Sequence, residues 1–186
     1  MDHPHPQESL LHSLTYRGVP VDIVSWADTV WCGKMGYASA AGAEEPDVER
    51  LMAQYMSLDH ASAAQSEVDW SVCISVNYLC PSRPRGVFFG SLAAAEDQPQ
   101  GFDLYHVPAA QYMRIRITGE TAQALGRPPW QGGIPPYHWI GEQIAPALGY
   151  TYGDDTLPIF EYYGFYCPET GAHEFCYLYV PVKRLK

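Results

Sequence analysis

Residues 158–164 place a single carboxylate among aromatic and branched side chains. Their sequence, Pro-Ile-Phe-Glu-Tyr-Tyr-Gly, is rich in strand-forming residues and is bounded by a proline and a glycine. Because side chains alternate across a strand, Ile159, Glu161 and Tyr163 are predicted to share one face. An ionised carboxylate in such surroundings is costly unless it is paired or hydrated. Glu161 is therefore a candidate for cation binding or acid/base chemistry; the alternative is an edge strand with Glu161 in water.

The bulk composition limits the classes to which this protein can belong. Its 186 residues suggest one domain, or two small halves that share one core. Lys+Arg total 11 against 21 Asp+Glu, and the net charge of −10 repels phosphates. This argues against nucleic-acid binding by this chain alone and weakly favours cationic ligands. The 14 tyrosines combine an apolar body with a polar tip, which suits wet pockets and interfaces.

The cysteines and the N-terminal sequence predict a cytoplasmic protein without a membrane segment. Five cysteines are present, with no Cys-x-x-Cys pair and no zinc spacing: Cys32, Cys73, Cys80, Cys167 and Cys176. We interpret them as reduced thiols rather than as a disulfide framework. Residues 1–14 lack the basic start and apolar centre of a signal peptide, and no apolar run approaches the roughly 18 residues of a membrane helix.

Residues 1–20 are predicted to form a loose N-terminal tail that can fold back on the rest of the chain. This segment carries His3, His5 and His12, which could in principle bind a metal ion. The prolines next to the first two histidines prevent a helical ligand face. We therefore interpret all three as solvated side chains and predict no metal site.

The first half of the chain is predicted to contain several strands and one helix. Residues 21–39 are β-rich and form one bent strand or two consecutive strands. A helix begins near residue 46, and an alternating strand covers residues 69–78. The apolar face of that strand is formed by Trp70, Val72, Ile74, Val76 and Tyr78. Residues 80–100 are predicted to be a long connection with one helical turn, followed by a strand over 102–107.

The second half repeats this order of elements. A strand over 111–118 precedes a helix that begins near residue 134 and ends before Gly149. Strands over 158–164 and 173–182 follow. The strand over 111–118 has an apolar face formed by Met113, Ile115 and Ile117. Its other face is mixed and is formed by Tyr112, Arg114 and Arg116.

The pattern strand–helix–strand–strand therefore occurs twice, over 22–107 and over 109–182. We expect an α+β fold in which duplicated βαββ units form antiparallel sheets with one helix each, related by a pseudo-two-fold axis. Residues 21–186 would then form a single domain. The cleft between its halves is the expected ligand site.

From about residue 102 onward, several short segments follow one another in a characteristic order: 105–109 with 111–117, the helix that carries Trp139, and then 146–150, 158–163 and 177–183. Together they resemble the GyrI-like small-molecule-binding domain. This domain is the effector-binding module of multidrug-responsive and AraC-type regulators. The first half of the chain matches only in pattern, and residues 80–100 depart from the compact form of the family.

The resemblance implies paired βαββ units with a central aromatic cleft and an acidic residue at its base. Glu161 corresponds to that acid, and Trp139 corresponds to the family's helical tryptophan. Tyr163 would share the face of Glu161, where its hydroxyl could donate to the carboxylate or to a ligand. Tyr112 and Tyr137 are further candidates for the cleft wall. The alternative for each aromatic residue is an ordinary place in the core.

Two functions are compatible with these residues. The first is a stand-alone module that binds apolar, planar or cationic small molecules for drug or toxin sequestration or for sensing, since aromatic faces attract cations. The alternative, which the resemblance to some stand-alone family members implies, is a metal-independent hydrolase of strained electrophilic natural products. Glu161 would then activate a water molecule, and Tyr163 would donate to the developing anion.

The sequence predicts no cofactor and identifies no protein-binding surface, although the family includes gyrase inhibitors. Haem would need an exposed axial histidine, and we interpret His106, His138 and His173 as structural residues instead. Only about 20 residues precede the first predicted strand, too few for the DNA-reading helix-turn-helix of the regulators. We therefore expect a small-molecule partner rather than a nucleic acid or a membrane.

Overall fold

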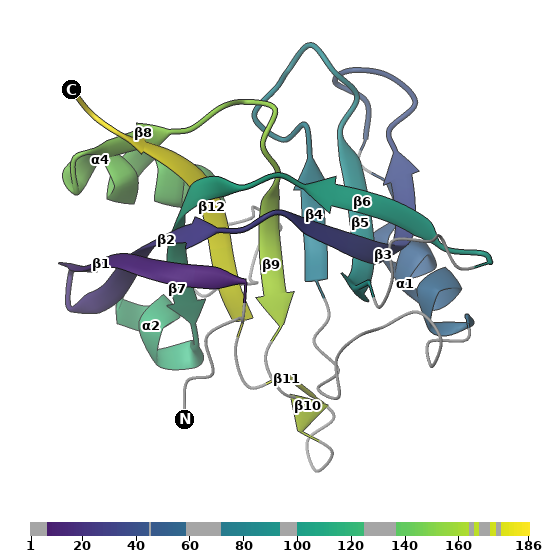
Figure 1. Ribbon diagram of the computed structural model, residues 1–186, viewed down its shortest axis with the longest axis horizontal. Coiled ribbons are helices and arrows are strands. Elements are labelled where there is room, and N and C mark those ends of the chain that lie inside the picture. The colour runs from purple at the N-terminus through teal and green to yellow at the C-terminus, as the bar shows by residue number, and fades with distance from the viewer. Residues whose placement is uncertain are drawn as a thin grey trace.

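The computed structural model describes residues 7–44, 46–58, 72–93, 100–124, 137–163, 166–167, 172–173 and 176–186. In chain order its elements are β1 (Glu8–Tyr16), β2 (Val19–Trp26), β3 (Thr29–Tyr37), α1 (Val48–Met56), β4 (Val72–Val76), β5 (Gly86–Leu92), β6 (Asp103–Val107), β7 (Ala110–Ile117), α2 (Gly119–Ala124), α3 (Tyr137–Trp139), η2 (Ile140–Ile144), α4 (Ala145–Ala147), β8 (Tyr150–Tyr152), β9 (Ile159–Tyr163), β10 (Tyr166–Cys167), β11 (Ala172–His173) and β12 (Cys176–Arg184). In the described part of the chain, ten strands form one sheet, and β10 pairs with β11 (Figure 1).

The strand order in the large sheet is β1-β2-β7-β12-β9-β4-β5-β3-β6, with β8 paired to β12, and all the pairs are antiparallel. Strands β7-β12-β9 come from the second half of the chain and β4-β5-β3 from the first. The two sets are in mirrored order, as a two-fold axis between β9 and β4 would give. This order confirms the predicted α+β fold with antiparallel strands.

One face of the sheet carries an aromatic core. Figure 1 shows β2 and β3 crossing in front of β12, β9, β4 and β5, and residues of both layers contribute rings to the core. The ring centroids of Phe160 and Tyr179 are 4.5 Å apart, and that of Trp26 lies 4.9 Å from that of Phe160. Burial of such large rings is a major source of stability.

The other face carries two clusters, each covered by a helix. Helix α1 packs on β3 and β5, with Tyr55 edge-on to Phe89. The continuous helix formed by α3, η2 and α4, called the second helix below and distinct from α2, packs on β8 and β12 through Ile140 and Ile144. Figure 1 places α1 and α4 at opposite sides of the view, so the middle strands β9 and β4 lie between the helices. None of the described helices is long and apolar enough to cross a membrane.

Several local predictions are confirmed. Residues 21–39 form two consecutive strands, β2 and β3. Helix α1 follows Asp47, whose side chain accepts a hydrogen bond from the amide of Arg50, a typical helix start. In β7, Tyr112 lies in the aromatic core, whereas the alternate apolar residues lie under the second helix: Met113, Ile115 and Ile117.

The prediction of a loose N-terminal tail is wrong for the described part of residues 1–20, because β1 is an edge strand of the sheet. Residues 1–6 lie outside the described residues. The side chain of Glu8 is 2% exposed and accepts hydrogen bonds from Arg114 and from the Tyr179 hydroxyl, the latter at 2.8 Å. Arg114 also donates to Asp22 at 2.6 Å. This network ties β1 to β7 and β12, so the polar composition of the segment reflects internal ion pairs as well as solvation.

The prediction of a long connection over residues 80–100 is also wrong, because β5 runs through it between β4 and β3. Residues 94–99 lie outside the described residues. Gly90 and Gly33 pair across β5 and β3, and a Cβ on Gly90 would lie 2.4 Å from the carbonyl oxygen of Cys32. Only glycine permits these strands to approach so closely.

Tyr78 does not lie on the face that alternation predicts for it. Strand β4 ends at Val76, and Asn77 has a φ of 57°, a left-handed conformation that asparagine tolerates. The Asn77 side chain donates to the carbonyl oxygen of Pro84 at 2.9 Å. This turn breaks the alternation. Tyr78 therefore packs with Tyr137 under the second helix, whereas Val76 lies in the aromatic core.

Candidate functional site

Glu161 lies on β9, a middle strand of the sheet, and is only 6% exposed. Its backbone neighbours are Leu178 on β12 and Cys73 on β4. Alternation places its side chain with Ile159 on the helix-covered face, whereas Phe160 enters the aromatic core. The alternative prediction, an edge strand with Glu161 in water, is therefore wrong.

Tyr137 provides a hydrogen bond to this carboxylate. It is the first residue of α3, is 2% exposed, and donates its hydroxyl hydrogen to Oε1 of Glu161. The ring of Tyr78 meets that of Tyr137 edge to face, with 5.4 Å between centroids, and the guanidinium of Arg85 lies 4.8 Å from the Tyr78 ring centroid. A neutral phenol stabilises a carboxylate by hydrogen bonding without cancelling its charge.

The thiol of Cys176 is close enough to Glu161 to be affected by its charge. Cys176 is 4% exposed on β12, next to β9. Burial raises the pKa of this thiol well above its usual range, and the negative charge of Glu161 raises it further. The thiol therefore stays protonated at neutral pH and is a poor nucleophile. Among the described side chains, the cysteines that are free thiols are Cys32, Cys73, Cys80 and Cys176; the side chain of Cys167 lies outside them.

Tyr137 is itself positioned by a close contact between the second helix and β8. The hydroxyl of Tyr152 donates to the carbonyl oxygen of Tyr137 at 3.2 Å. The Tyr152 ring lies so near Gly141 that a Cβ there would be 1.8 Å from its Cζ. Gly141 belongs to η2, a π-helical turn, and such turns are frequent at functional sites. Burial raises the pKa of Tyr152 to about 12, with a contribution from Glu142, so its hydroxyl is a donor at neutral pH.

Trp139 points away from Tyr137, as residues two apart on a helix do. Its indole N–H donates to Oε1 of Gln143 at 2.7 Å, and its ring packs edge-on against Tyr16 at 6.4 Å between centroids. It is partly buried against the cluster under the second helix. The structure thus gives Trp139 a packing role and does not bring it to Glu161.

Tyr112 and Tyr163 were also predicted near Glu161. Tyr112 is 0% exposed in the aromatic core on the opposite face of the sheet, so it does not share a site with Glu161. The backbone of Tyr163 pairs with Cys176 at the end of β9. The side chain of Tyr163 lies outside the described residues, and its role remains a prediction.

Three residues that support the site were not identified from the sequence. Tyr78 was assigned to the wrong face because the left-handed turn before it is not visible in an alternating pattern. Gly141 and Tyr152 meet only because the helix packs on β8. Gly141, an isolated glycine inside the predicted helix, was the one sequence signal of this contact, since glycine in a helix often marks a close approach.

The described residues contain no group of three or more His, Cys, Asp or Glu side chains that could hold a metal ion. The side chain of His106 is 58% exposed, and its Nε2 lies 3.5 Å from Oδ2 of Asp28. It is therefore a surface residue with an acidic neighbour. The side chains of His138 and His173 lie outside the described residues.

No protein-family model matches this chain, and no curated protein sequence matches it. Solved structures do share its fold. SAV2435 bound to tetraphenylphosphonium aligns over 88% of this chain and 93% of its own, with a TM-score of 0.53 and 13% identity. The C-terminal domain of EcmrR aligns over 89% and 98%, with a TM-score of 0.54 and 11% identity.

A putative bacterial transcription regulation protein from Staphylococcus aureus MU50 also aligns over 89% of this chain and 99% of its own, with a TM-score of 0.52 and 13% identity. In the EcmrR–DNA complex, this chain covers 57% of the EcmrR chain. At such low identities the likeness establishes a common fold. That fold confirms the predicted likeness to a GyrI-like effector-binding domain at the level of architecture.

Proposed function

We propose that this chain binds an apolar, planar or cationic small molecule over β9 and β4, between the two helices, with Glu161 as the negative group that faces the ligand. The observation that carries this proposal is the buried Glu161 carboxylate, which the Tyr137 hydroxyl holds on a middle strand of the sheet. Drug or toxin sequestration, or sensing, is the biological role that we infer.

The electrostatics favour a cation in this position. A cationic ligand would offset the cost of keeping a carboxylate away from water, and the attraction between opposite charges is stronger there than in bulk solvent. The Tyr78 ring already accepts a cation, since the Arg85 guanidinium lies 4.8 Å from its centroid. The net charge of −10 adds a weak long-range attraction for cations.

The ligand class is taken from a fold neighbour. SAV2435 is a protein of the same fold bound to tetraphenylphosphonium, an apolar cation that carries four phenyl rings. The proposed site here would combine Tyr137 and Tyr78 with the carboxylate, and Tyr163 remains a proposed member because it is two residues from Glu161 in the alternating pattern of the strand. Tyr112 and Trp139 are excluded because of where their side chains lie.

The test compares two probes of the same shape and opposite charge. Tetraphenylphosphonium and tetraphenylborate are titrated into the wild type, Glu161→Gln and Glu49→Gln by isothermal titration calorimetry. Glu49 is an exposed residue of α1, so its variant removes the same charge away from the proposed site. In Glu161→Gln, the Tyr137 hydroxyl can still donate to the amide oxygen, which preserves the local packing.

We expect the wild type and Glu49→Gln to prefer the phosphonium and Glu161→Gln to lose about tenfold in affinity for it, which corresponds to about 1.4 kcal/mol. Equal phosphonium affinity in Glu161→Gln and wild type would overturn the role of Glu161. Equal affinity of the wild type for both probes would overturn the preference for cations. Melting temperatures of all three proteins check that each is folded.

The hydrolase alternative is tested on the same variants with an electrophilic, strained-ring substrate and a mass-spectrometric readout of the ring-opened product. Water attack would add one molecule of water and require Glu161 to accept a proton. Product formation that is lost in Glu161→Gln would support hydrolysis. Binding without product in the wild type would favour the binding module alone.

A further inference from the structure

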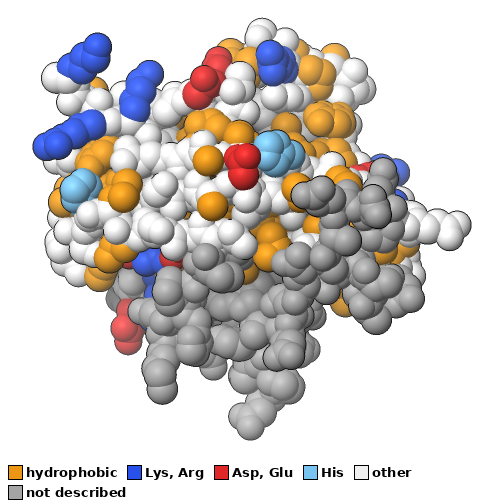
Figure 2. Space-filling model, in the orientation of Figure 1, with side chains coloured by type: hydrophobic (Ala, Val, Ile, Leu, Met, Phe, Trp, Pro, Cys, Tyr) orange, Lys and Arg blue, Asp and Glu red, His pale blue; other side chains and the backbone are white. Residues whose placement is uncertain are grey.

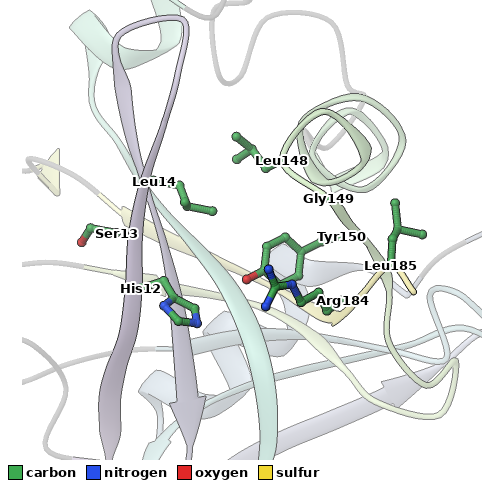
Figure 3. A pocket seen from close by; sticks show the side chains of 8 residues that line it. All are labelled: His12, Ser13, Leu14, Leu148, Gly149, Tyr150, Arg184 and Leu185. Atoms are coloured by element: carbon green, nitrogen blue, oxygen red, sulfur yellow. The ribbon is translucent and has the colours of Figure 1, made fainter.

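A separate pocket lies where β1, the end of α4 and the last residues of β12 meet (Figure 3). Its volume is about 510 Å³, within the roughly 300–1,000 Å³ of small-molecule sites. None of its lining residues is Glu161, Tyr137 or Tyr78. The pocket is therefore independent of the function proposed above.

The walls of this pocket combine apolar and polar surface in similar amounts. Leu14 on β1 and Leu148 at the end of the helix are partly buried against the neighbouring cluster, and Tyr150 is 6% exposed. Leu185 closes another side and is 50% exposed. Gly149 ends the helix with a φ of 83°, and a Cβ on it would meet nothing within 4 Å, so this side of the pocket stays open.

Three polar groups converge inside these walls. Figure 3 shows the guanidinium of Arg184 beside the hydroxyl of Tyr150, with the imidazole of His12 across the pocket. In the described part of the chain, the side chains of Arg184 and His12 have no hydrogen-bond or ion-pair partner. A guanidinium offers paired N–H groups that match a carboxylate, so this arrangement favours an anion.

A β-bulge brings His12 into the pocket. The pairing of β1 with β2 shifts between Leu10 and His12, so Leu11 is an extra residue. Before the bulge, Glu8 faces the aromatic side, where it accepts a hydrogen bond from Tyr179. After the bulge, the even-numbered residues of β1 face the helix-covered side of the sheet, as their partners on β2 do. Without the bulge, Glu8 and His12 would share one face.

The surface charge around the pocket also suits an anion. Figure 2 shows Lys and Arg side chains gathered at the upper left, the corner where Figure 1 places the C-terminal end of β12. This local excess of positive charge contrasts with the net charge of −10 for the chain. It would attract an anion that the rest of the surface repels.

We propose that this pocket is a second ligand site, which binds an organic carboxylate with an aromatic or branched apolar body. The carboxylate pairs with Arg184 and accepts hydrogen bonds from Tyr150 and His12, and the apolar body packs on Leu14 and Leu148. Opposite charge requirements separate the two sites: this one takes an anion, and the one over β9 takes a cation.

The test uses 2-naphthoate and its uncharged analogue 2-naphthamide, titrated into the isotopically labelled protein and followed by amide chemical shifts. Arg184→Gln removes the cation of the pocket, and Lys183→Gln is the matched control. Lys183 precedes Arg184 on β12, is exposed, and points to the opposite face of the strand. Inorganic phosphate serves as an anion without an apolar body.

We expect naphthoate to shift the amides of Gly149 and Leu185, and Arg184→Gln to weaken its binding about fivefold, as for an exposed ion pair of about 1 kcal/mol. Lys183→Gln should bind as the wild type does. Equal affinities for naphthoate and naphthamide, or an equal loss in both variants, would overturn the anion assignment. Phosphate binding as tight as naphthoate binding would overturn the role of the apolar walls.

Tetraphenylphosphonium titrations distinguish this proposal from the one for the Glu161 site. Arg184→Gln should leave phosphonium affinity unchanged, and Glu161→Gln should leave naphthoate affinity unchanged. Loss of naphthoate binding in Glu161→Gln would overturn the independence of the two sites. Both variants are checked for wild-type melting temperature before titration.

Discussion

Replacing Tyr112 by phenylalanine should stabilise this protein. Tyr112 is 0% exposed, and its hydroxyl oxygen has no hydrogen-bond partner among the described residues. Burial raises the pKa of this tyrosine above its usual range, so the hydroxyl is neutral and still needs a partner. In the unfolded chain, water satisfies it. Tyr112→Phe removes only this atom and keeps the ring in the aromatic core.

The neighbouring Tyr179 gives the matched comparison. It is also 0% exposed, and its ring centroid lies 6.3 Å from that of Tyr112. Its hydroxyl, however, donates to the buried Glu8 carboxylate at 2.8 Å. A buried unsatisfied polar group costs about 1–3 kcal/mol, and a hydrogen bond to a charged group contributes about 1.5–3 kcal/mol. We therefore expect about 1 kcal/mol gained in Tyr112→Phe and about 2 kcal/mol lost in Tyr179→Phe.

Urea unfolding followed by tryptophan fluorescence under reducing conditions measures both free energies of unfolding. In a chain of this length, the changes correspond to a rise of about 2–4 °C in Tm for Tyr112→Phe and a fall of about 4–8 °C for Tyr179→Phe. A similar loss of stability in the two variants would refute the reasoning, because it would mean that the Tyr112 hydroxyl is satisfied in solution.

Three further predictions concern other parts of the fold. Gly141→Ala should lose about 2 kcal/mol of stability in urea unfolding, because its methyl group would overlap the Tyr152 ring. Adding Tyr152→Leu to the same chain should restore part of the lost stability. Equal stability of Gly141→Ala and wild type would contradict this contact. Glu8→Gln should lose about 3 kcal/mol in the same assay and increase hydrogen exchange in β1, since it removes a charged partner from the largely buried Arg114. Unchanged hydrogen exchange in β1 would count against the ion network. Stability should fall as pH rises from about 9 to 12. Burial raises the pKa of Cys32 to about 11 and that of Tyr105 to about 12. In this range the folded state therefore keeps protons that the unfolded state has lost. Urea midpoints that stay constant over this pH range would contradict the last prediction.

Strand faces were predicted well wherever the pattern was local. The alternation around Glu161 correctly separated it from Phe160, because successive side chains of any regular strand point to opposite faces. It could not show which face carries the helices. That depends on how β9 pairs with β4 and β12, which join segments far apart in the sequence.

Two deviations from regular alternation change which side chains share a face. The left-handed Asn77 moves Tyr78 to the other face, and the bulge at Leu11 separates Glu8 from His12. Both are single-residue events: the bulge reverses the faces of all later residues of β1, and Asn77 ends the alternation just after β4. An asparagine or a leucine occurs in many contexts, so neither residue signals the event in the sequence.

Residues were misjudged when their long-range partners were not visible. The polar residues of β1 indicated a tail, yet Glu8 is buried by Arg114 from a strand that lies 106 positions further along the chain. The glycines of β5 indicated a loop, yet Gly90 permits the close approach of Gly33. In both cases, composition reflected a contact with a distant segment rather than with solvent.

The sequence by itself determined the α+β class and the presence of most strands, because these follow from hydrophobic periodicity over a few residues. It identified Glu161 as a candidate, but the structure decided that this carboxylate is buried. Only the tertiary structure decided which aromatic residues accompany that carboxylate. It brought Tyr137 to Glu161, placed Trp139 and Tyr112 elsewhere, and formed a pocket around Arg184. The physical reason is that a side chain's direction is set locally, whereas its neighbours are set by strand pairing and helix packing between residues far apart in the chain.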